Sequence, residues 1–304
     1  MRHILIDTDT GSDDAAAIIM MLRAADIQVD AITTVAGNVD LHYATHNALV
    51  SVAMANTYLP AVYEGCDAPL LAPVQRATVH GVNGLSDIDY PRPDIPVSSL
   101  HAAGSIANFA KTAPDPEILA LGPLTNIAMA IVLYPEAMKN IKRIVAMGGQ
   151  HKFLNPHTPV AEFNISCDPH AAQVVLQSGI FTEFVPFDPC VGPCALNGQD
   201  MQKLRAFGSN SADFVLDCNR TLIHYSTRML GEDALLLPDA IAAAYLIDPA
   251  VAVERIPCRI DCELASPLTI GQLIYDKHSV TPNGALIAAC DPVLFKNMLF
   301  DLCK

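Results

Sequence analysis

Basic residues are scarce in this sequence: 18 of its 304 residues are lysine or arginine, against 32 aspartates and glutamates. The formal net charge of -14 at pH 7 repels polyanions, so we expect neither nucleic acid nor an anionic membrane surface as a partner. The sequence also lacks any apolar run of the roughly 18 residues needed to cross a bilayer, and any apolar N-terminal stretch long enough for a signal peptide. These absences predict a soluble, cytoplasmic protein whose ligand is a metal ion or a small neutral or cationic molecule.

Cysteine is present, but without the pattern of a disulfide scaffold. The nine cysteines are odd in number and scattered in spacing, which favours reduced thiols in a reducing compartment. The pairs Cys190/Cys194 and Cys258/Cys262 are four residues apart, whereas a zinc knuckle has a spacing of three. We therefore interpret these cysteines as small buried side chains.

The hydrophobic content of 51% allows a sizeable core, and no composition shift, internal repeat or low-complexity linker divides the chain. Residues 1–304 are therefore expected to form a single domain. Short β-rich runs alternate with segments of helical period, which is typical of parallel strands joined by helical crossovers. We expect an α/β, Rossmann-like fold, in which an open, mostly parallel sheet carries helices on both faces.

The expected elements follow this alternation along the chain. Strands are expected at residues 3–6, 30–35, 118–121, 141–147, 183–187 and about 250–260. Helices are expected at residues 15–25, from about 124, and at 168–178, 209–229 and 238–247, with a proline-rich surface loop at 89–96. Because ligands of open α/β sheets bind beyond the carboxyl ends of the strands, the loops that follow the strands are where chemistry is expected.

The loop after the first strand is crowded with acids. It carries four carboxylates within eight residues: Asp7, Asp9, Asp13 and Asp14. Like charges so close raise one another's pKa, and several oxygen ligands together suit calcium or magnesium. A helix cap at Ser12 or Asp13 is the alternative, but it accounts for only one or two of the acids. Ile18 excludes an EF-hand, which needs glutamate there, and the acids after Gly11 exclude a Walker-type phosphate loop.

This acidic run, Asp-Thr-Asp-Thr-Gly-Ser-Asp-Asp-Ala over residues 7–15, resembles the opening motif of the nucleoside hydrolases. Other segments match the pattern of that family in the same order over essentially the whole chain. They are residues 33–38, 47–49, 80–85, 121–126, 147–149, 161–164 with 168–169, 238–240 and 268–271, the last of which resembles the closing strand motif of the family. Each match alone is weak, whereas the ordered set is highly specific.

The resemblance implies a glycosidase of nucleoside catabolism and base salvage, which hydrolyses the N-glycosidic bond of ribonucleosides to ribose and free nucleobase. The reaction passes through an oxocarbenium-like state, so the site needs an activated water, stabilisation of positive charge and help for the leaving base. In the family pattern, calcium is held by Asp9, Asp14, Asp239 and the backbone carbonyl of Thr125, which suits an ion that accepts six to eight oxygen ligands. By the same resemblance, Asp13 is the general base for a calcium-positioned water.

The resemblance also implies a set of substrate contacts. Asn38, Glu162 and Asn164 would hydrogen-bond the ribose hydroxyls, and this rejects 2'-deoxy sugars because buried polar groups would lose their partners. Asp7 would support the metal loop and contact the ribose region. Further ligand contacts are expected from Met147, Phe163 and Tyr225. Two alternatives stay open: Glu162 and Asn164 belong to a loop that caps the following helix, and the Met147 side chain is a core residue.

The match breaks at Pro238. Many members of the family carry a histidine immediately before the last calcium aspartate, where it protonates the departing base, and proline has no ionisable group. The candidates for a replacement acid are His80, in a glycine-flanked loop, and His224 with Tyr225, in a segment that resembles the mobile base-binding wall of the family. The other histidines, including His42, His46, His151 and His157, are interpreted as surface or loop residues. The preferred nucleobase, whether purine, pyrimidine or either, is left open by this break.

Two other functions remain as alternatives. A non-catalytic, calcium-dependent ribose or nucleoside binder would keep the metal site, but it would have no need of a general base at Asp13. A magnesium-dependent phosphatase of the haloacid-dehalogenase type also has Asp-x-Asp after its first strand, but Gly11 and the Asp13-Asp14 pair fit that pattern poorly. The nucleoside hydrolases are commonly dimeric or tetrameric, so the resemblance implies a homodimer or homotetramer with a small-molecule substrate.

Overall fold

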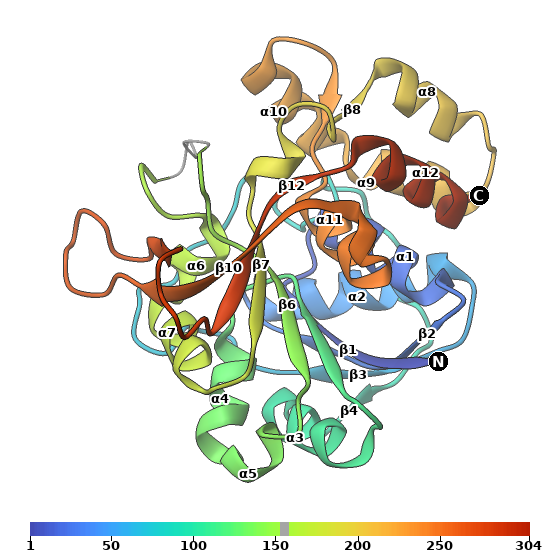
Figure 1. Cartoon of the computed structure of the whole chain (residues 1–304). Helices are drawn as coiled ribbons and strands as arrows, with labels where there is room; N and C mark the ends of the chain where they lie inside the picture. Colours follow the sequence, from blue (N-terminus) through green and yellow to red (C-terminus); the bar gives the residue numbers. More distant parts are fainter. Residues whose placement is uncertain (153–157) are drawn as a thin grey trace.

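The computed structural model of this chain describes residues 1–152 and 158–304. A ten-stranded mixed sheet crosses the molecule and carries helices on both faces, as Figure 1 shows. This arrangement confirms the expected α/β architecture. His157 lies outside the described residues. Among the described helices, none has both the length and the apolar character required to cross a membrane.

The large sheet is mostly parallel. Its strands are β1 (Arg2–Thr8), β2 (Ile27–Thr34), β3 (Ala61–Glu64), β4 (Val97–Ser98), β5 (Glu117–Ala120), β6 (Arg143–Met147), β7 (Thr182–Val185), β10 (Ala252–Cys262), β11 (Leu273–Asp276) and β12 (Gly284–Cys290). Their order across the sheet is β11-β10-β12-β7-β6-β5-β1-β2-β3-β4, and β10 is antiparallel to both of its neighbours. A separate antiparallel pair joins β8 (Leu196–Asn197) to β9 (Ala234–Leu235).

Helices connect most of these strands. They are α1 (Ser12–Arg23), α2 (Leu41–Ala55), α3 (Ala102–Thr112), α4 (Thr125–Leu133), α5 (Pro135–Met138), α6 (Phe163–Cys167), α7 (Pro169–Gln177), α8 (Gly198–Arg205), α9 (Asn210–Cys218), α10 (Arg220–Leu230), α11 (Pro238–Ile247) and α12 (Pro292–Cys303). Two short 3-10 turns, Asp188–Cys190 and Pro249–Val251, follow β7 and α11.

Two apolar cores lie on opposite faces of the sheet. Successive residues of a strand point to opposite faces, so Ile4 and Ile6 of β1 enter one core while Leu5 enters the other. The first core is completed by side chains of α1, α2, α11 and α12, and the second by side chains of α3, α4 and α7. Because most strands are buried on both faces, they read as continuous apolar runs in the sequence.

Two expectations about elements are wrong. The helix expected over residues 209–229 is two helices, since Asn219 ends α9 and its side-chain amide donates to the carbonyls of Ser12 and Val215, 2.8 Å away in both cases. The closing strand expected at residues 268–271 is a turn, because the Thr269 amide donates to Ser266 and Gly271 has a φ of +84°. The last strands of the sheet, β11 and β12, follow that turn.

Candidate active site

A cavity of about 640 Å3, counting space open to solvent, lies at the carboxyl ends of the parallel strands, and its size is typical of a small-molecule site. Residues at or shortly after the carboxyl ends of β2, β5, β6 and β7 line it, as expected for an open α/β sheet. Nine of the residues singled out from the sequence lie in its wall: Asp13, Asn38, His80, Met147, Glu162, Phe163, Asn164, Tyr225 and Asp239.

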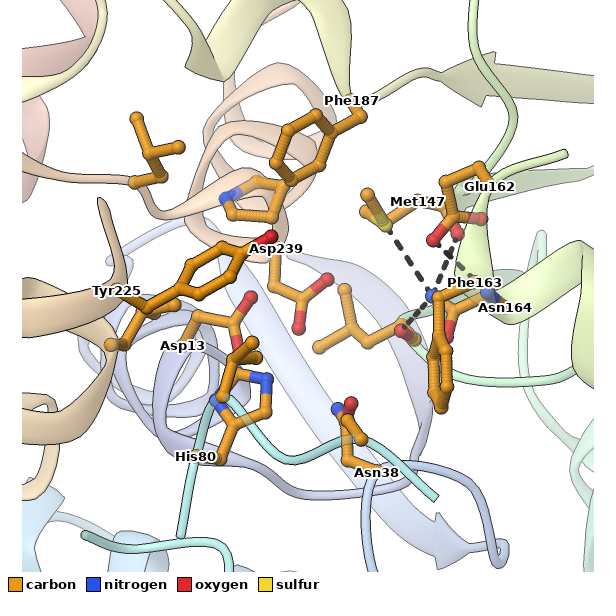
Figure 2. A pocket seen from close by; sticks show the side chains of 16 residues that line it. Asp13, Asn38, His80, Met147, Glu162, Phe163, Asn164, Phe187, Tyr225 and Asp239 are labelled. Atoms are coloured by element: carbon orange, nitrogen blue, oxygen red, sulfur yellow. Dashed lines mark hydrogen bonds and ion pairs between the residues drawn. The ribbon is translucent and has the colours of Figure 1, made fainter. Parts of the chain in front are cut away.

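The polar residues fall on two opposing walls. In Figure 2, Asp13 and Asp239 lie on one side of the cavity, and Glu162, Phe163 and Asn164 lie on the other. Asn38 lies below the space between these walls, His80 lies below Asp13 on the acidic side, and Phe187 lies above the space (Figure 2). The cavity therefore presents carboxylates to one side of a ligand, and an amide with a further carboxylate to the other.

The acidic wall is built by two helix N-termini that meet. Asp13 and Asp14 open α1, Asp239 opens α11, and one carboxylate oxygen of each lies within 4.8 Å of the others. Burial raises the pKa of all three, and repulsion from neighbouring aspartates adds to this for Asp14 and Asp239, so the pKa of Asp14 reaches about 7. Such a cluster resists ionisation until a cation joins it, which is the behaviour of an oxygen-ligand metal site.

Asp9 belongs to the same cluster. Burial, followed by the nearby charge of Asp14, raises its pKa well above the ordinary value. The carboxylate of Asp9 accepts hydrogen bonds from the backbone nitrogen of Asn38 at 2.6 Å and from its side-chain amide at 3.2 Å. A Cβ at Gly37 would lie 2.1 Å from one Asp9 oxygen, and a Cβ at Gly122 would lie 2.8 Å from the other. Positions 37 and 122 must therefore be glycine for the backbones of their two loops to approach this carboxylate.

Thr125 and Asp7 lie outside the cavity wall. Thr125 is the first residue of α4, is buried, and donates its hydroxyl to Asp168 at 2.8 Å. Asp7 accepts from Thr33 at 2.6 Å and from Asn126 at 2.8 Å, and burial raises its pKa to about 6. Asp7 therefore supports the loop that carries Asp9, and the structure does not bring it to the cavity for the expected contact with ribose.

Glu162 caps a helix and also lines the cavity. Its carboxylate caps α6 by accepting from the backbone nitrogens of Asn164 at 3.0 Å and Ile165 at 3.4 Å, and it also lines the cavity. Burial raises its pKa to about 7. The amide nitrogen of Asn164 donates to the Leu121 carbonyl at 2.7 Å, and it lies 3.3 Å from both the carbonyl oxygen and the sulfur of Met147. Met147 is likewise both a core residue and part of the cavity wall.

The histidines singled out from the sequence separate clearly. The Nδ1 atom of His80 lies 2.9 Å from the Ser12 hydroxyl and 3.6 Å from an Asp13 oxygen, which places His80 beside the acidic cluster. On α10, Tyr225 lines the cavity whereas His224 is exposed and is not part of its wall. Adjacent residues on a helix point about 100° apart, and here only Tyr225 faces the cavity. The expectation that His224 belongs to the site is therefore wrong.

Five apolar wall residues were missed from the sequence: Ala77, Val79, Phe187, Leu222 and Leu236. Signals for two of them were present. Phe187 follows β7 at the strand edge where the other loops converge. Leu222 lies three residues before Tyr225 and therefore on the same face of α10. Leu236 offers no such signal, since it follows the two-residue strand β9.

Comparison with known proteins gives a consistent result. The sequence profile described as inosine-uridine preferring nucleoside hydrolase matches residues 4–297. The inosine-uridine preferring nucleoside hydrolase of Crithidia fasciculata is 34% identical over 289 residues, which cover 92% of this chain and 90% of that protein. The non-specific ribonucleoside hydrolase RihC of Salmonella paratyphi A is 36% identical over 276 residues, which cover 90% of this chain and 88% of that protein.

A solved structure agrees with these relatives. An inosine-guanosine nucleoside hydrolase superposes with a TM-score of 0.91 at 25% sequence identity, with 100% of this chain and 99% of that chain covered. The profile match and the curated relatives extend over nearly the whole sequence. The chain accordingly belongs to the nucleoside hydrolase family, whose enzymes cleave the N-glycosidic bond of ribonucleosides.

Proposed function

We propose that this enzyme releases the nucleobase from ribonucleosides with a calcium ion held by Asp9, Asp14, Asp239 and the carbonyl of Thr125, and with Asp13 as the general base. The observation that carries the proposal is the buried acidic cluster of Asp9, Asp13, Asp14 and Asp239. Within residues 1–152 and 158–304, no lysine or arginine forms an ion pair with any of these four carboxylates. Buried carboxylates in this number need a positive charge, and a bound cation supplies it.

The donors favour calcium over other ions. The cluster offers oxygen atoms, which suit calcium and magnesium, whereas zinc prefers sulfur and nitrogen ligands. Calcium accepts six to eight oxygens in flexible geometry, which leaves room for ligands from the substrate. When bound, the ion neutralises the carboxylates and makes a nearby water more acidic.

Asp13 is suited to accept the proton of the attacking water. Its Oδ1 atom has no hydrogen-bond partner within the described part of the chain, and its side chain lines the cavity. Burial raises the pKa of Asp13, and the neighbouring His80 opposes that rise. A buried carboxylate in the cavity wall, with Oδ1 3.6 Å from Nδ1 of His80, is suited to general-base catalysis.

The opposite wall holds the sugar in this proposal. Glu162 and Asn164 face the acidic wall across the cavity, and Asn38 lies between the walls, so the three can hydrogen-bond ribose hydroxyls from several directions (Figure 2). Met147 and Phe163 provide the apolar contacts beside them. The surrounding carboxylates favour the positive charge that develops on the ribose ring as the bond breaks.

We further propose that His80 protonates the leaving base, with Tyr225 as the alternative donor. Both line the cavity, while Pro238, also in the wall, has no proton to give. The assignment is tested with His80→Asn and Tyr225→Phe on inosine, uridine and p-nitrophenyl riboside, whose leaving group departs without protonation. Loss of the acid should lower kcat on the nucleosides by about 100-fold or more and leave the aryl riboside nearly unaffected. Equal losses on both substrate classes would contradict the assignment for that residue.

The reaction itself is tested by measuring reducing sugar released from a panel of purine and pyrimidine ribonucleosides, their 2'-deoxy analogues and the corresponding nucleotides. We expect ribose from ribonucleosides, much less sugar from the deoxy analogues, and no phosphate from nucleotides. Chelation of the metal should abolish release, and calcium should restore it. Tight nucleoside binding without any release of sugar would refute the proposed turnover.

We also propose that residues 1–304 fold as one domain, that the enzyme is a homodimer or homotetramer, and that it is cytoplasmic. The domain proposal is supported by one sheet that extends through most of the chain and separates two apolar cores. All nine cysteines are free thiols, which suits a reducing compartment. Sedimentation of the purified protein at several concentrations tests the oligomeric state.

A further inference from the structure

We propose that Arg2 and Tyr245 are positioning residues, which fix helix α11 along its axis and so hold Asp239 in the metal site at the other end of the helix. This inference rests on the proposed function, because it takes Asp239 to be a metal ligand. Neither Arg2 nor Tyr245 lines the active-site cavity.

Arg2 holds the far end of α11. Its Nη1 atom donates to the carbonyl of Leu246 at 2.6 Å and lies 3.4 Å from that of Ile247. The last carbonyls of a helix have no partner within the helix and carry partial negative charge, so a guanidinium is favourable there. The same guanidinium donates to both oxygens of Glu117, at 3.0 and 2.9 Å, which fixes its orientation. The end of α11 is thereby attached to β1 and β5.

Tyr245 forms a second attachment. Its side chain is among the largest that are fully buried, and its hydroxyl donates to Glu183 on β7 at 3.0 Å. Glu183 is itself held by Arg143 and Arg255, each at 2.7 Å. The C-terminal end of α11 is therefore attached to β7 as well as to β1, two strands separated by β5 and β6.

The packing of α11 explains why these attachments matter. Helix α11 packs along α1, and the buried faces of the two helices contain the alanine runs Ala15–Ala17 and Ala242–Ala244 (Figure 1). Side chains this small form shallow ridges, which resist sliding of one helix along the other less than large interlocking residues do. The end contacts are then what fixes the axial position of α11.

That axial position decides the geometry of the acidic cluster. Asp239 precedes Tyr245 by six residues, a rise of about 9 Å along a helix. Because the helix is rigid over this length, an axial shift of its C-terminal end moves the Asp239 carboxylate by a similar amount. Metal ligands must lie within about 0.5 Å of their productive positions. The partner helix is also held at its far end, where Arg23 of α1 donates to the carbonyls of Ala55 and Leu302 at 2.9 and 3.0 Å.

The test compares two variants, each of which removes one hydrogen bond to the same carboxylate oxygen. Tyr245 and Arg255 both donate to Oε1 of Glu183, but only Tyr245 is on α11. Tyr245→Phe removes the bond from α11 to Glu183, whereas the control Arg255→Gln weakens the same network beside Tyr245 and leaves the bond from the Tyr245 hydroxyl to Glu183 in place. Arg2→Gln removes the other attachment, while Glu117 keeps its contact with Arg143. For each full-length variant, the calcium dissociation constant is measured by titration calorimetry and the unfolding temperature by differential scanning calorimetry.

We expect Tyr245→Phe and Arg2→Gln to raise the calcium dissociation constant by about 3- to 10-fold, and Arg255→Gln to leave it unchanged. Saturating calcium should return kcat of Tyr245→Phe to the wild-type value. Lower unfolding temperatures with unchanged calcium affinity would overturn the inference, since that result shows a purely structural role. Equal weakening in Arg255→Gln would overturn the assignment to α11. If the wild-type protein bound no calcium at all, the metal site itself would be refuted, and this inference with it.

Discussion

Two groups of buried carboxylates lie at opposite ends of the same sheet, and the chain treats them differently. Glu117 and Glu183 lie at the amino ends of β5 and β7, where Arg2, Arg143 and Arg255 form ion pairs with them. Burial alone would raise the pKa of Glu117, but hydrogen bonds and charge from Arg2 and Arg143 outweigh it and lower the pKa overall. This end of the sheet is complete without any added ion.

The carboxyl end of the sheet lacks this compensation. Asp9, Asp13, Asp14 and Asp239 are as deeply buried as the glutamates, but burial raises the pKa of all four, and repulsion between them adds to this for Asp9, Asp14 and Asp239. The difference teaches that burial of acids is not by itself a sign of function. A buried acid paired with arginine contributes to stability. A group of buried acids with no lysine or arginine beside it is instead suited to bind a metal ion.

The largest contrast is expected in catalysis. Asp13→Asn should lower kcat by about 100- to 10,000-fold, because the amide cannot accept the proton from water. Glu117→Gln, at the other end of the sheet, should keep kcat close to wild type when calcium is saturating. Steady-state ribose release from the best nucleoside measures both variants. Substantial turnover in Asp13→Asn would show that another group is the base.

The free energy of unfolding should depend strongly on Glu117, whose substitution leaves catalysis nearly unchanged. Glu117→Gln should lower the free energy of unfolding by about 3 kcal/mol, because Arg2 and Arg143 lose the charge of a largely buried partner. Urea denaturation at pH 7.5 with calcium present measures this change, and Asp301→Asn, which breaks an exposed ion pair with Lys304, serves as the control. If the two variants were equally stable, the network around Glu117 would contribute no more than a surface pair.

Calcium should stabilise the protein through the aspartate cluster. At a calcium concentration about 100 times the dissociation constant, the free energy of unfolding should rise by about 2.7 kcal/mol. Asp14→Asn should lose most of this gain, since it removes one proposed ligand. The measurement is denaturant unfolding with chelator or with calcium. A gain of the same size in Asp14→Asn would mean that calcium binds elsewhere.

A further contrast is in the pH dependence of the calcium-free protein. The pKa of Asp14 is raised from 3.8 to about 7, so the folded state binds its proton more tightly than the unfolded state does. Stability due to this group is present at low pH and is lost as the pH rises toward 7, by up to about 1.4 kcal/mol per pH unit. Asp14→Asn should flatten this decline.

Glu117 should act in the opposite direction. Its pKa is lowered from 4.5, so its stabilising effect is present above that value and is lost as the pH falls below it. Unfolding curves from pH 4 to 8 in chelator, compared among wild type, Asp14→Asn and Glu117→Gln, separate the two trends. If the unfolding free energies of wild type and Asp14→Asn changed in parallel with pH, Asp14 would not cause the decline, and the two ends of the sheet would not differ in pH dependence.

Much of the site was predictable because it follows local patterns. One continuous segment of the sequence contains β1, the acidic loop and the apolar helix α1, so local patterns were enough to predict all three. In a parallel sheet all such loops emerge at one edge, and the family resemblance then assigned Asn38, Met147 and Glu162 to the same site as Asp13. The turn at residues 268–271 was missed because four residues carry too little pattern to distinguish a strand from a turn.

Other features depended on orientation and long-range contact. Periodicity alone did not reveal that Asn219 breaks a helix, because its partner is the carbonyl of Ser12 far away in the chain. The choice between His224 and Tyr225 depended on which face of α10 meets the cavity. The arginine clamps on Glu117 and Glu183 join residues from separate strands and have no local signature.

The sequence by itself therefore determined the fold class, the family resemblance and the acidic loop, because these arise from residue types at short, regular spacings. Only the tertiary structure decided that Asp239 meets Asp13 and Asp14, that His80 lies beside them, and that α11 is held from its far end. Contacts between distant segments depend on how helices slide and rotate as they pack, and that geometry is fixed only when the whole core forms.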